Sequence, residues 1–335
     1  MRAIVYSEKG PASVLRLVDR AVPEPGVGEV RVKLAFSGVN PTDVKSRSGG
    51  VARGDFAEVT PGQDGAGTVD AVGLGVEGLA VGDRVWLYLA QHGQPYGTTA
   101  EYVTVPAARA VPLPASAELE LGAALGVPAI TAHRALTAGS VARLSPGSLA
   151  GQHVLVQGGA GAVGNAAVQL ARWAGASVIA TVSSDEKAAL AGAAGAQHVV
   201  DYKHTDAEAG IRAAAPDGVD LVVEVAPAVN NELDQAVART GATIAFYANN
   251  GGDQLVLDVR STFSRGLRYQ GLLLYTLSDE LLEAAVADVS AAVAAGALRV
   301  GEDAGLPLHR FPLEQAAEAH DAVDGGAIGK VLIEL

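Results

Sequence analysis

The sequence predicts an α/β protein in which a doubly wound parallel sheet is inserted into a β-rich domain. Residues 1 to about 125 contain short strand patterns separated by turn residues, which is typical of an antiparallel or barrel-like domain. From residue 153 onward, continuous apolar runs alternate with helical segments, as expected for a parallel sheet covered by helices on both faces. Strand-like texture returns after Gly296, so the chain is expected to re-enter the first domain.

The first domain is predicted from short runs that alternate polar and apolar residues or are wholly apolar. Dipeptides such as Pro-Gly and Gly-Asp break the chain between these runs. The expected strands span residues 3–7, 29–39, 67–73, 82–90 and 101–106, and a helix at about 313–324 followed by a strand at 329–335 completes the domain. We therefore expect one β-rich domain made of residues 1–125 and 297–335.

The second domain is predicted from the alternation of strands and helices between residues 126 and 296. It begins with a helical stretch at 121–140 that leads into the first strand. The expected strands are 153–158, 177–183, 198–201, 220–226, 242–248 and 269–275, and the expected helices are 163–174, 185–194, 206–214, 230–239 and 278–295. Six such strands predict a doubly wound sheet with the order 3-2-1-4-5-6, which is the Rossmann arrangement.

The composition disfavours several classes of function. The chain has 335 residues, 49% apolar and 18% charged, which is enough for two buried cores and too apolar for disorder. Its net charge of −13 argues against nucleic acid as a partner, and the absence of cysteine removes disulfides and thiolate zinc sites. The start of the chain is charged where a signal peptide is apolar, and the uncharged stretch 154–171 fits a strand, turn and helix better than a membrane span. We expect a soluble, cytoplasmic protein.

A glycine turn joins the first strand of the second domain to its helix and predicts a dinucleotide site. Gly159, Gly161 and Gly164 fit the pattern G-x-G-x-x-G, with Ala162 and Val163 between the last two. The first glycine permits a tight turn, the second lets the backbone approach a pyrophosphate, and the third lets the helix pack on the strand. A flexible glycine loop is the alternative, but the strand–turn–helix context favours a dinucleotide. The Lys-Ser/Thr pair of a nucleoside triphosphate loop is absent.

The end of the second strand predicts NADPH rather than NADH. An NAD site needs a carboxylate there to hold the ribose 2′-hydroxyl, whereas this chain has Ser183 and Ser184. Hydroxyls followed by Lys187 suit a 2′-phosphate, which a carboxylate would repel. Asp185 stands two residues late and is interpreted as the cap of the next helix. The alternative for Lys187 is a solvated helix charge.

With these residues in place, the chain resembles the quinone oxidoreductase (ζ-crystallin-like) branch of the medium-chain dehydrogenase/reductase superfamily, the branch that works without zinc. The likeness extends over nearly the whole chain and is strongest around the glycine turn. It rests on residues 38–49, 61–73, 81–85, 126–136, 151–172, 201–206 and 325–335, which occur in the same order. It implies a catalytic domain of GroES-like fold around a Rossmann NADP-binding domain. It also implies NADPH-dependent reduction of quinones or α,β-unsaturated carbonyls and a homodimer joined through the Rossmann domains.

The resemblance also implies roles for single residues. Tyr202 corresponds to a tyrosine beside the adenosine end of the cofactor, with Ser183 and Lys187 at the 2′-phosphate. Thr131 and Phe246 correspond to residues that flank the nicotinamide. Two further residues are implied near the reacting groups: Asn40, which faces nicotinamide and substrate, and Lys330, a basic position near the cofactor.

Three departures from the family pattern bear on the chemistry. Zinc-dependent relatives carry Gly-His-Glu where this chain has Gly-Gln63-Asp64, and they use a cysteine that this chain lacks, so a catalytic zinc is not expected. Quinone reductases often have tyrosine where Lys45 stands, which leaves the proton donor open. Phe246 is usually followed by glycine but is followed here by Tyr247, so the loop beside the nicotinamide is expected to differ.

Without a metal, hydride transfer to a conjugated acceptor is easier than oxidation of an alcohol, because the resulting enolate or hydroquinone anion delocalises its charge. We hypothesise that Asn40 orients nicotinamide or substrate and that Lys45 or water supplies the proton; the alternative for Lys45 is a solvated surface lysine. Asp43 and Asp64 are interpreted as loop or cap residues. The loop 88–98 offers Tyr88, Gln91, His92 and Tyr96 to a pocket, and 46–56, with three glycines, is a candidate mobile lid.

Two other functions remain open from the sequence. One is a zinc-free alcohol or enoyl-thioester oxidoreductase on the same scaffold. The other is an NADPH-binding protein with a structural, sensory or RNA-binding role and negligible turnover, although the acidic charge disfavours RNA. For the leading function the expected ligands are NADPH and a small quinone or enone, with neither nucleic acid nor a membrane as a partner.

Overall fold

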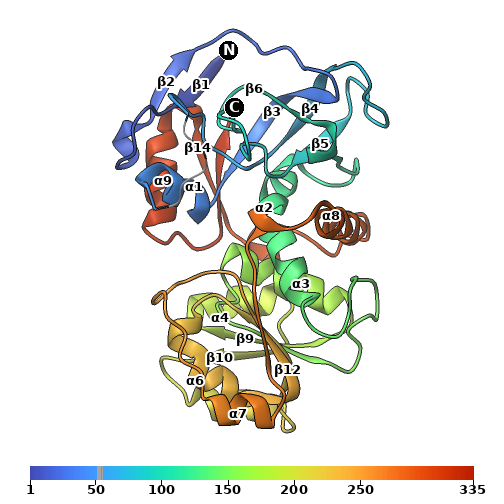
Figure 1. Ribbon diagram of the computed structural model, residues 1–335, viewed down its shortest axis with the longest axis vertical. Coiled ribbons are helices and arrows are strands. Elements are labelled where there is room, and N and C mark those ends of the chain that lie inside the picture. The colour runs from blue at the N-terminus through green and yellow to red at the C-terminus, as the bar shows by residue number, and fades with distance from the viewer. Residues whose placement is uncertain (51–53, 55) are drawn as a thin grey trace. The chain divides into compact units, whose positions relative to one another are not determined.

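A computed structural model describes residues 1–50, 54 and 56–335 of the chain, which divides into two compact units (Figure 1). Unit 1 combines Met1–Val127 with Leu308–Leu335, and unit 2 is the continuous segment Pro128–Pro307. The centre of the candidate lid, residues 51–53 and 55, lies outside the described residues. In the part of the chain that the structure describes, no helix is long and apolar enough to cross a membrane.

Unit 1 is built on a mostly antiparallel sheet of seven strands with the order β14-β15-β3-β4-β5-β7, and β6 pairs with β3. Two further strands, β1 and β2, form a separate antiparallel pair. The strands are β1 (Arg2–Val5), β2 (Arg16–Asp19), β3 (Glu29–Val39), β4 (Asp64–Val72), β5 (Arg84–Leu87), β6 (Tyr102–Pro106), β7 (Ala110–Pro112), β14 (Leu308–Pro312) and β15 (Lys330–Glu334).

The C-terminal segment belongs to unit 1 because β15 pairs antiparallel with β3. Alternating apolar residues of β3 and β6, including Val30, Val32, Val103 and Val105, are fully or almost fully buried and form the core of this sheet. Two helices complete the unit: α1 (Pro41–Ser48) and α9 (Ala316–Asp324), which lie side by side in Figure 1 and pack against each other. The sequence did not predict α1, which is short and almost entirely polar.

Unit 2 contains a six-stranded sheet that is parallel throughout and has the order β10-β9-β8-β11-β12-β13. Counted along the chain this is 3-2-1-4-5-6, so the predicted doubly wound Rossmann sheet is confirmed. Its strands are β8 (His153–Val156), β9 (Ser177–Val182), β10 (His198–Asp201), β11 (Val219–Glu224), β12 (Ala238–Phe246) and β13 (Arg268–Gly271).

The helices of unit 2 follow the strands in alternation, and Figure 1 shows them around the sheet. Right-handed crossovers place the helices of the two halves on opposite faces of such a sheet. The helices of unit 2 are α3 (Ala162–Trp173), α4 (Asp185–Ala193), α5 (Ala207–Ala214), α6 (Pro227–Val237), α7 (Val259–Ser264) and α8 (Asp279–Ala294). Helix α2 (Leu119–Leu136) is the segment in which the chain passes from unit 1 to unit 2. The core between sheet and helices is aliphatic and includes Leu155, Ile179, Ile211, Val222 and Ile244.

Two boundaries differ from the prediction for local reasons. The last strand ends at Gly271, and Leu274–Thr276 form a 3-10 turn, although the apolar run 269–275 resembles one continuous strand. Helix α6 begins at Pro227 instead of 230, because proline at the first helical position needs no N–H bond and already has a helical φ.

Candidate functional site

The glycine turn between β8 and α3 is held by close packing at two of its three glycines. A Cβ atom on Gly159 would lie 2.7 Å from the Cβ of Ala180 in β9, and one on Gly164 would lie 2.3 Å from the carbonyl oxygen of Gly158. A Cβ on Gly161 would meet nothing nearer than 3.5 Å. The first and third glycines are therefore required by the fold, whereas the second leaves space in front of the turn.

The start of α3 presents backbone N–H groups at this turn. Gly161 is the N-cap residue and has no side chain with which to cap the helix. The first N–H groups of a helix, here those that follow Gly161 at Ala162 and Val163, have no partner within the helix. Together with the positive end of the helix dipole they form a binding site for negatively charged phosphate. The turn therefore fits the pyrophosphate of a dinucleotide.

The end of β9 brings together the hydroxyl and ammonium groups predicted for a 2′-phosphate. The Lys187 Nζ atom donates a hydrogen bond to Ser183 Oγ at 3.2 Å. Tyr202 follows the neighbouring strand β10, and its backbone N–H donates to the carbonyl oxygen of Val182. The Tyr202 side chain is half exposed, so its ring is accessible at the same edge of the sheet.

The interpretation of Asp185 as a helix cap is wrong. The N-cap of α4 is Ser184, whose Oγ accepts a hydrogen bond from the backbone N–H of Lys187 at 3.3 Å. Asp185 is exposed in the first turn of the helix, where its charge suits the helix dipole. The hydroxyl of Ser184 thus serves the helix, and Ser183 is the residue of this pair that contacts the lysine ammonium.

The residues predicted beside the nicotinamide lie on separate elements of unit 2. Thr131 is buried in α2. Phe246 ends β12, and its ring packs on Gly271, where an added Cβ would come within 3.1 Å of Phe246 Cζ. Tyr247 follows, and burial together with the charge of Glu224 raises the pKa of its phenol well above the usual range.

Unit 1 contains a buried polar cluster made of Asn40, Asp64 and Lys330. The Lys330 Nζ atom donates to Asn40 Oδ1 at 2.6 Å and lies 3.5 Å from Asp64 Oδ2. Asn40 Nδ2 donates to Asp64 Oδ2 at 2.8 Å, and the backbone N–H of Val127 donates to Asp64 Oδ1 at 2.8 Å. The cluster thus joins the end of β3, the start of β4 and the start of β15.

Two glycines make room for this cluster. A Cβ on Gly38 would lie 2.1 Å from the carbonyl oxygen of Ala123 and 3.0 Å from Lys330 Cε, and a Cβ on Gly126 would lie 2.1 Å from Asp64 Oδ1. The charges are fully enclosed, because Asp64 and Lys330 are at most 2% exposed. Burial raises the pKa of Asp64 and lowers the pKa of Lys330, since each charged form loses its water.

The structure revises the interpretation of Asp64 and agrees with that of Asp43. Asp64 is not a loop or cap residue, because it joins Asn40, Lys330 and the backbone of α2. Asp43 does act as predicted at the start of α1, where its Oδ2 accepts the backbone N–H of Asn40 at 2.9 Å. Sequence spacing could not reveal the pair of Asn40 and Lys330, which are 290 positions apart.

Lys45 differs from this cluster in its exposure to solvent. Its side chain is exposed on α1, whereas Asn40, which precedes that helix, is buried.

The loop at 88–98 also differs from the expected pocket lining. Tyr88 is buried and its hydroxyl donates to the carbonyl oxygen of Ala108, while Tyr96 is exposed, with the Arg20 guanidinium over its ring.

The residues at the position of a catalytic zinc do not fit that metal. Gln63 is buried, and its amide Nε2 donates to Gln91 Oε1 at 3.2 Å. Its neighbour Asp64 is occupied by Asn40, Lys330 and Val127. Amides are poor zinc ligands, and the sequence contains no cysteine. Among residues 1–50, 54 and 56–335, no group of three or more His, Cys, Asp or Glu could hold a metal ion.

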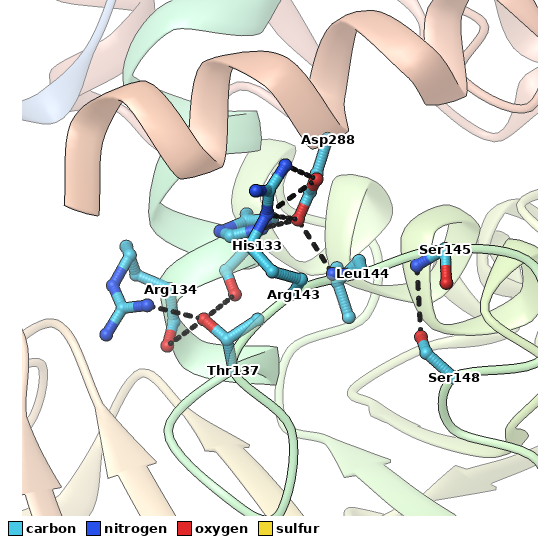
Figure 2. Close-up of polar contacts among 8 residues, drawn as sticks. All are labelled: His133, Arg134, Thr137, Arg143, Leu144, Ser145, Ser148 and Asp288. Atoms are coloured by element: carbon cyan, nitrogen blue, oxygen red, sulfur yellow. Dashed lines mark hydrogen bonds and ion pairs between the residues drawn. The ribbon is translucent and has the colours of Figure 1, made fainter. Parts of the chain in front are cut away.

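A buried histidine anchors α2 within unit 2 (Figure 2). His133 Nε2 lies 2.8 Å from Asp288 Oδ2 in α8, and Asp288 also accepts hydrogen bonds from the Arg143 guanidinium and from the backbone N–H of Leu144. Burial lowers the pKa of His133, opposed by Asp288. This histidine belongs to the packing of unit 2, and it fixes the helix that carries Thr131.

Sequence reasoning missed a buried network next to the glycine turn. Gln157, which follows β8, bonds to Thr181 of β9 and to Asp234 of α6, and Glu224 ends β11 beside them. A signal was present, because Gln157 and Glu224 are polar residues at the ends of strongly apolar strands, where an apolar residue would be expected.

Two family models match the chain. Residues 26–115 match the alcohol dehydrogenase GroES-like domain, and residues 162–294 match the zinc-binding dehydrogenase model. The quinone oxidoreductase of Rattus norvegicus is 32% identical over 343 residues, covering 100% of this chain and 98% of the relative.

Solved structures give the same result over the whole chain. A mycobacterial protein complexed with NADPH, Rv1454c, is 30% identical with a TM-score of 0.83, covering 100% of both chains. An NAD-dependent alcohol dehydrogenase is 30% identical with a TM-score of 0.84, again covering 100% of both. The Rossmann sheet, the glycine turn and these full-length similarities show an oxidoreductase, and the chain belongs to the quinone oxidoreductase family of the medium-chain dehydrogenases/reductases.

Proposed function

We propose that this protein is an NADPH-dependent reductase of quinones or α,β-unsaturated carbonyl compounds that works without a metal. The observation that carries the choice of cofactor is the contact between Lys187 Nζ and Ser183 Oγ at the end of β9. A cation and a hydroxyl at this position complement a 2′-phosphate, whereas an NAD site has a carboxylate there. Relatives named quinone oxidoreductase support the choice of substrate class.

In this proposal unit 2 binds the cofactor, and NADPH supplies the hydride. The turn at Gly159–Gly164 holds the pyrophosphate, Ser183 and Lys187 hold the 2′-phosphate, and Tyr202 lies against the adenosine. Thr131 and Phe246 flank the nicotinamide. The space left in front of Gly161 and the half-exposed ring of Tyr202 support these assignments.

The cluster in unit 1 orients Asn40. Its amide is fixed at both ends, because Nδ2 donates to Asp64 and Oδ1 accepts from Lys330. A rigid amide beside a buried ammonium group is a preorganised polar environment, which stabilises charge that develops on the acceptor oxygen. The proton comes from water or from Lys45; the exposure of the Lys45 side chain on α1 makes exchange with solvent simple.

The proposal of a metal-free reaction rests on the donor set. Gln63 and Asp64 occupy the zinc-ligand positions of the metal-dependent relatives, and both are committed to other buried hydrogen bonds.

We further propose a cytoplasmic homodimer that associates through unit 2, for which sedimentation equilibrium is the direct measurement.

The decisive experiment follows NADPH absorbance with 1,4-benzoquinone, 9,10-phenanthrenequinone and 2-hexenal in buffer containing a metal chelator. NADPH oxidation by at least one acceptor, with NADH at least tenfold less efficient, is the expected result. Equal efficiency with NADH would contradict the cofactor assignment. Reduction of NADP⁺ by simple alcohols under the same conditions would favour an alcohol oxidoreductase, and tight NADPH binding with no turnover on any acceptor would favour a structural or sensory role.

A further inference from the structure

The carboxyl edge of the parallel sheet in unit 2 contains two fully buried acids, Glu224 and Asp234. Glu224 is the last residue of β11, and Asp234 lies in α6, the helix that follows it. One oxygen of each acid is already bonded: Glu224 Oε1 accepts from Ala226 N–H and from Asn230 Nδ2, and Asp234 Oδ1 accepts from Gln157 Nε2 at 2.8 Å. The other oxygens, Glu224 Oε2 and Asp234 Oδ2, have no further donor among the described residues.

The carboxyl groups of the two acids lie near enough to influence each other. Burial, followed by the charge of Glu224 and a hydrogen bond to it, raises the pKa of Asp234 well above the usual range. A protonated Asp234 would have a hydroxyl that donates to the neighbouring carboxylate, which would satisfy the unbonded oxygens.

A chain of hydrogen bonds leads from Asp234 to the glycine turn. Thr181 Oγ1 donates to Gln157 Oε1 at 2.5 Å, and the backbone N–H of Gly158 donates to Thr181 Oγ1 at 3.3 Å. The carbonyl oxygen of the same threonine accepts the N–H of Gly159 at 3.0 Å. Asp234 is therefore connected to Gly158 and Gly159 through the side chain of Gln157 and through Thr181, both buried.

These hydrogen bonds lie at the place where a doubly wound sheet binds its ligand. Strands β8 and β11 are neighbours at the point where the strand order reverses, and Gln157 and Glu224 stand at their carboxyl ends. Ligands of doubly wound sheets bind in the crevice at this reversal. The acids lie too deep to touch a ligand themselves, so their effect passes through the turn.

We propose that Asp234, which lies beside Glu224 in this buried site, is a positioning residue for the cofactor. Acting through Gln157 and Thr181, it fixes the backbone of Gly158 and Gly159 in the conformation that receives the pyrophosphate. This inference rests on the proposed function, because it assumes that the turn binds NADPH. It adds residues of α6 and β11 to the determinants of cofactor affinity.

The test measures the Kd of NADPH by fluorescence titration and the midpoint of thermal unfolding for the full-length protein and four variants. Asp234→Leu removes the acceptor of Gln157, and Thr181→Val breaks the chain next to the turn, so each is expected to raise the Kd about tenfold. Asp234→Asn keeps an acceptor for Gln157 and a donor for Glu224, so it is expected to retain a Kd within about twofold of the unsubstituted protein.

Asn231→Leu is the matched control. Asn231 lies one turn before Asp234 in α6 and makes two partly buried hydrogen bonds, to the Val256 carbonyl oxygen and from the Tyr269 hydroxyl, neither of which leads to the glycine turn. It is expected to lower the unfolding midpoint and to leave the Kd unchanged.

The double variant Asp234→Leu with Thr181→Val separates positioning from general damage. Because both substitutions interrupt the same series of hydrogen bonds, the double variant is expected to raise the Kd no more than either single substitution does. Independent effects on the Kd would multiply instead. A normal Kd in Asp234→Leu or Thr181→Val, or a Kd in Asp234→Asn as weak as in Asp234→Leu, would overturn the proposal. Should Asp234→Leu not fold, Thr181→Val and Asp234→Asn still decide it. Failure of the unsubstituted protein to bind either NADPH or NADH would instead refute the proposed function.

Discussion

At the scale of single residues, the preference for NADPH that we propose depends on one lysine and its contact with Ser183. Lys187 is four residues after Ser183, on the first turn of α4, and this spacing lets its ammonium group contact Ser183 Oγ at the end of β9. Ser184 cannot be exchanged freely, because its hydroxyl caps the same helix. Ser183 and Lys187 are therefore the positions at which cofactor choice can be altered with little effect on the fold.

We predict that Ser183→Asp combined with Lys187→Ala reverses the cofactor preference. The new carboxylate repels a 2′-phosphate and can accept from a ribose 2′-hydroxyl, so the KM for NADPH is expected to rise at least tenfold while the KM for NADH falls. Steady-state kinetics with both cofactors measure this. Glu186→Ala, a change at an exposed position of the same turn, serves as the control and is expected to leave both values within about twofold.

A buried histidine in unit 1 predicts how stability depends on pH. His320 in α9 is buried near Arg47, and burial, aided by that positive charge, lowers its pKa to about 3. The unfolded chain binds a proton near pH 6.5 and the folded chain does not, so stability rises with pH through this window and falls as the pH drops from about 6.5 toward 3.

We therefore predict that the free energy of unfolding falls by about 1.4 kcal/mol for each pH unit below about 6 through this residue alone. His320→Gln removes the titrating group. Denaturant unfolding at pH 7 and pH 5 is expected to show a smaller loss in the variant, by about 1 to 2 kcal/mol, than in the unsubstituted protein. Equal losses in the two proteins would show that His320 can accept a proton without unfolding.

At the scale of elements, the three glycines of the turn have separable roles. Gly159 and Gly164 are closed in by Ala180 and by the Gly158 carbonyl, whereas a Cβ on Gly161 would meet no atom nearer than 3.5 Å. The motif in the sequence predicts that Gly159 and Gly164 serve the fold and that Gly161 lies against the pyrophosphate; the close contacts at Gly159 and Gly164 agree with the first part, and the second part stays a prediction.

We predict that Gly161→Ala weakens NADPH binding without destabilising the fold. The added methyl group meets no atom nearer than 3.5 Å in the protein, yet it occupies the space that the pyrophosphate needs. The Kd for NADPH is expected to rise at least tenfold, and the unfolding midpoint is expected to change by less than about 2 °C. Gly192→Ala in α4, where nothing lies within 4 Å, is the control and is expected to leave the Kd unchanged. A Gly161→Ala protein that binds NADPH normally would show that the phosphates lie elsewhere.

The elements that the sequence predicted well are those with a strong local pattern. Strands β8, β9 and β11 are largely continuous apolar runs, and helices such as α3 and α5 are amphipathic, so both follow from periodicity. The short helix α1 escaped because its residues are nearly all polar, and β13 was extended because Leu272–Leu274 are as apolar as a strand. The cluster of Asn40, Asp64 and Lys330 joins segments far apart in the chain, and no pattern within one segment encodes such a contact.

At the scale of the whole molecule, the two units differ in how the chain supplies them. Unit 2 is one continuous segment whose sheet and core are complete within residues 128–307. Unit 1 needs both ends of the chain, since β15 pairs with β3 and supplies Val331 and Ile333 to the core shared with Ile4 and Val39. Lys330, which begins β15, also neutralises the buried Asp64. The C-terminal segment therefore completes both the packing and the charge balance of unit 1.

This difference predicts that the segment 119–307, which includes the whole of α2, folds alone, whereas 1–127 does not. In 119–307 every hydrogen bond of the parallel sheet is retained together with the glycine turn, Ser183 and Lys187, so cooperative thermal unfolding and a Kd for NADPH within about tenfold of the full-length value are expected. In 1–127 the edge of β3 has no partner strand, and Asp64 keeps a buried charge without its ammonium partner. The loss of that partner lowers the free energy of unfolding by about 3 to 5 kcal/mol. Circular dichroism and calorimetry of the two segments, with addition of residues 308–335 as a separate peptide to 1–127, measure both. Gain of structure on adding the peptide is expected, and a folded 1–127 without it would show that β15 is dispensable.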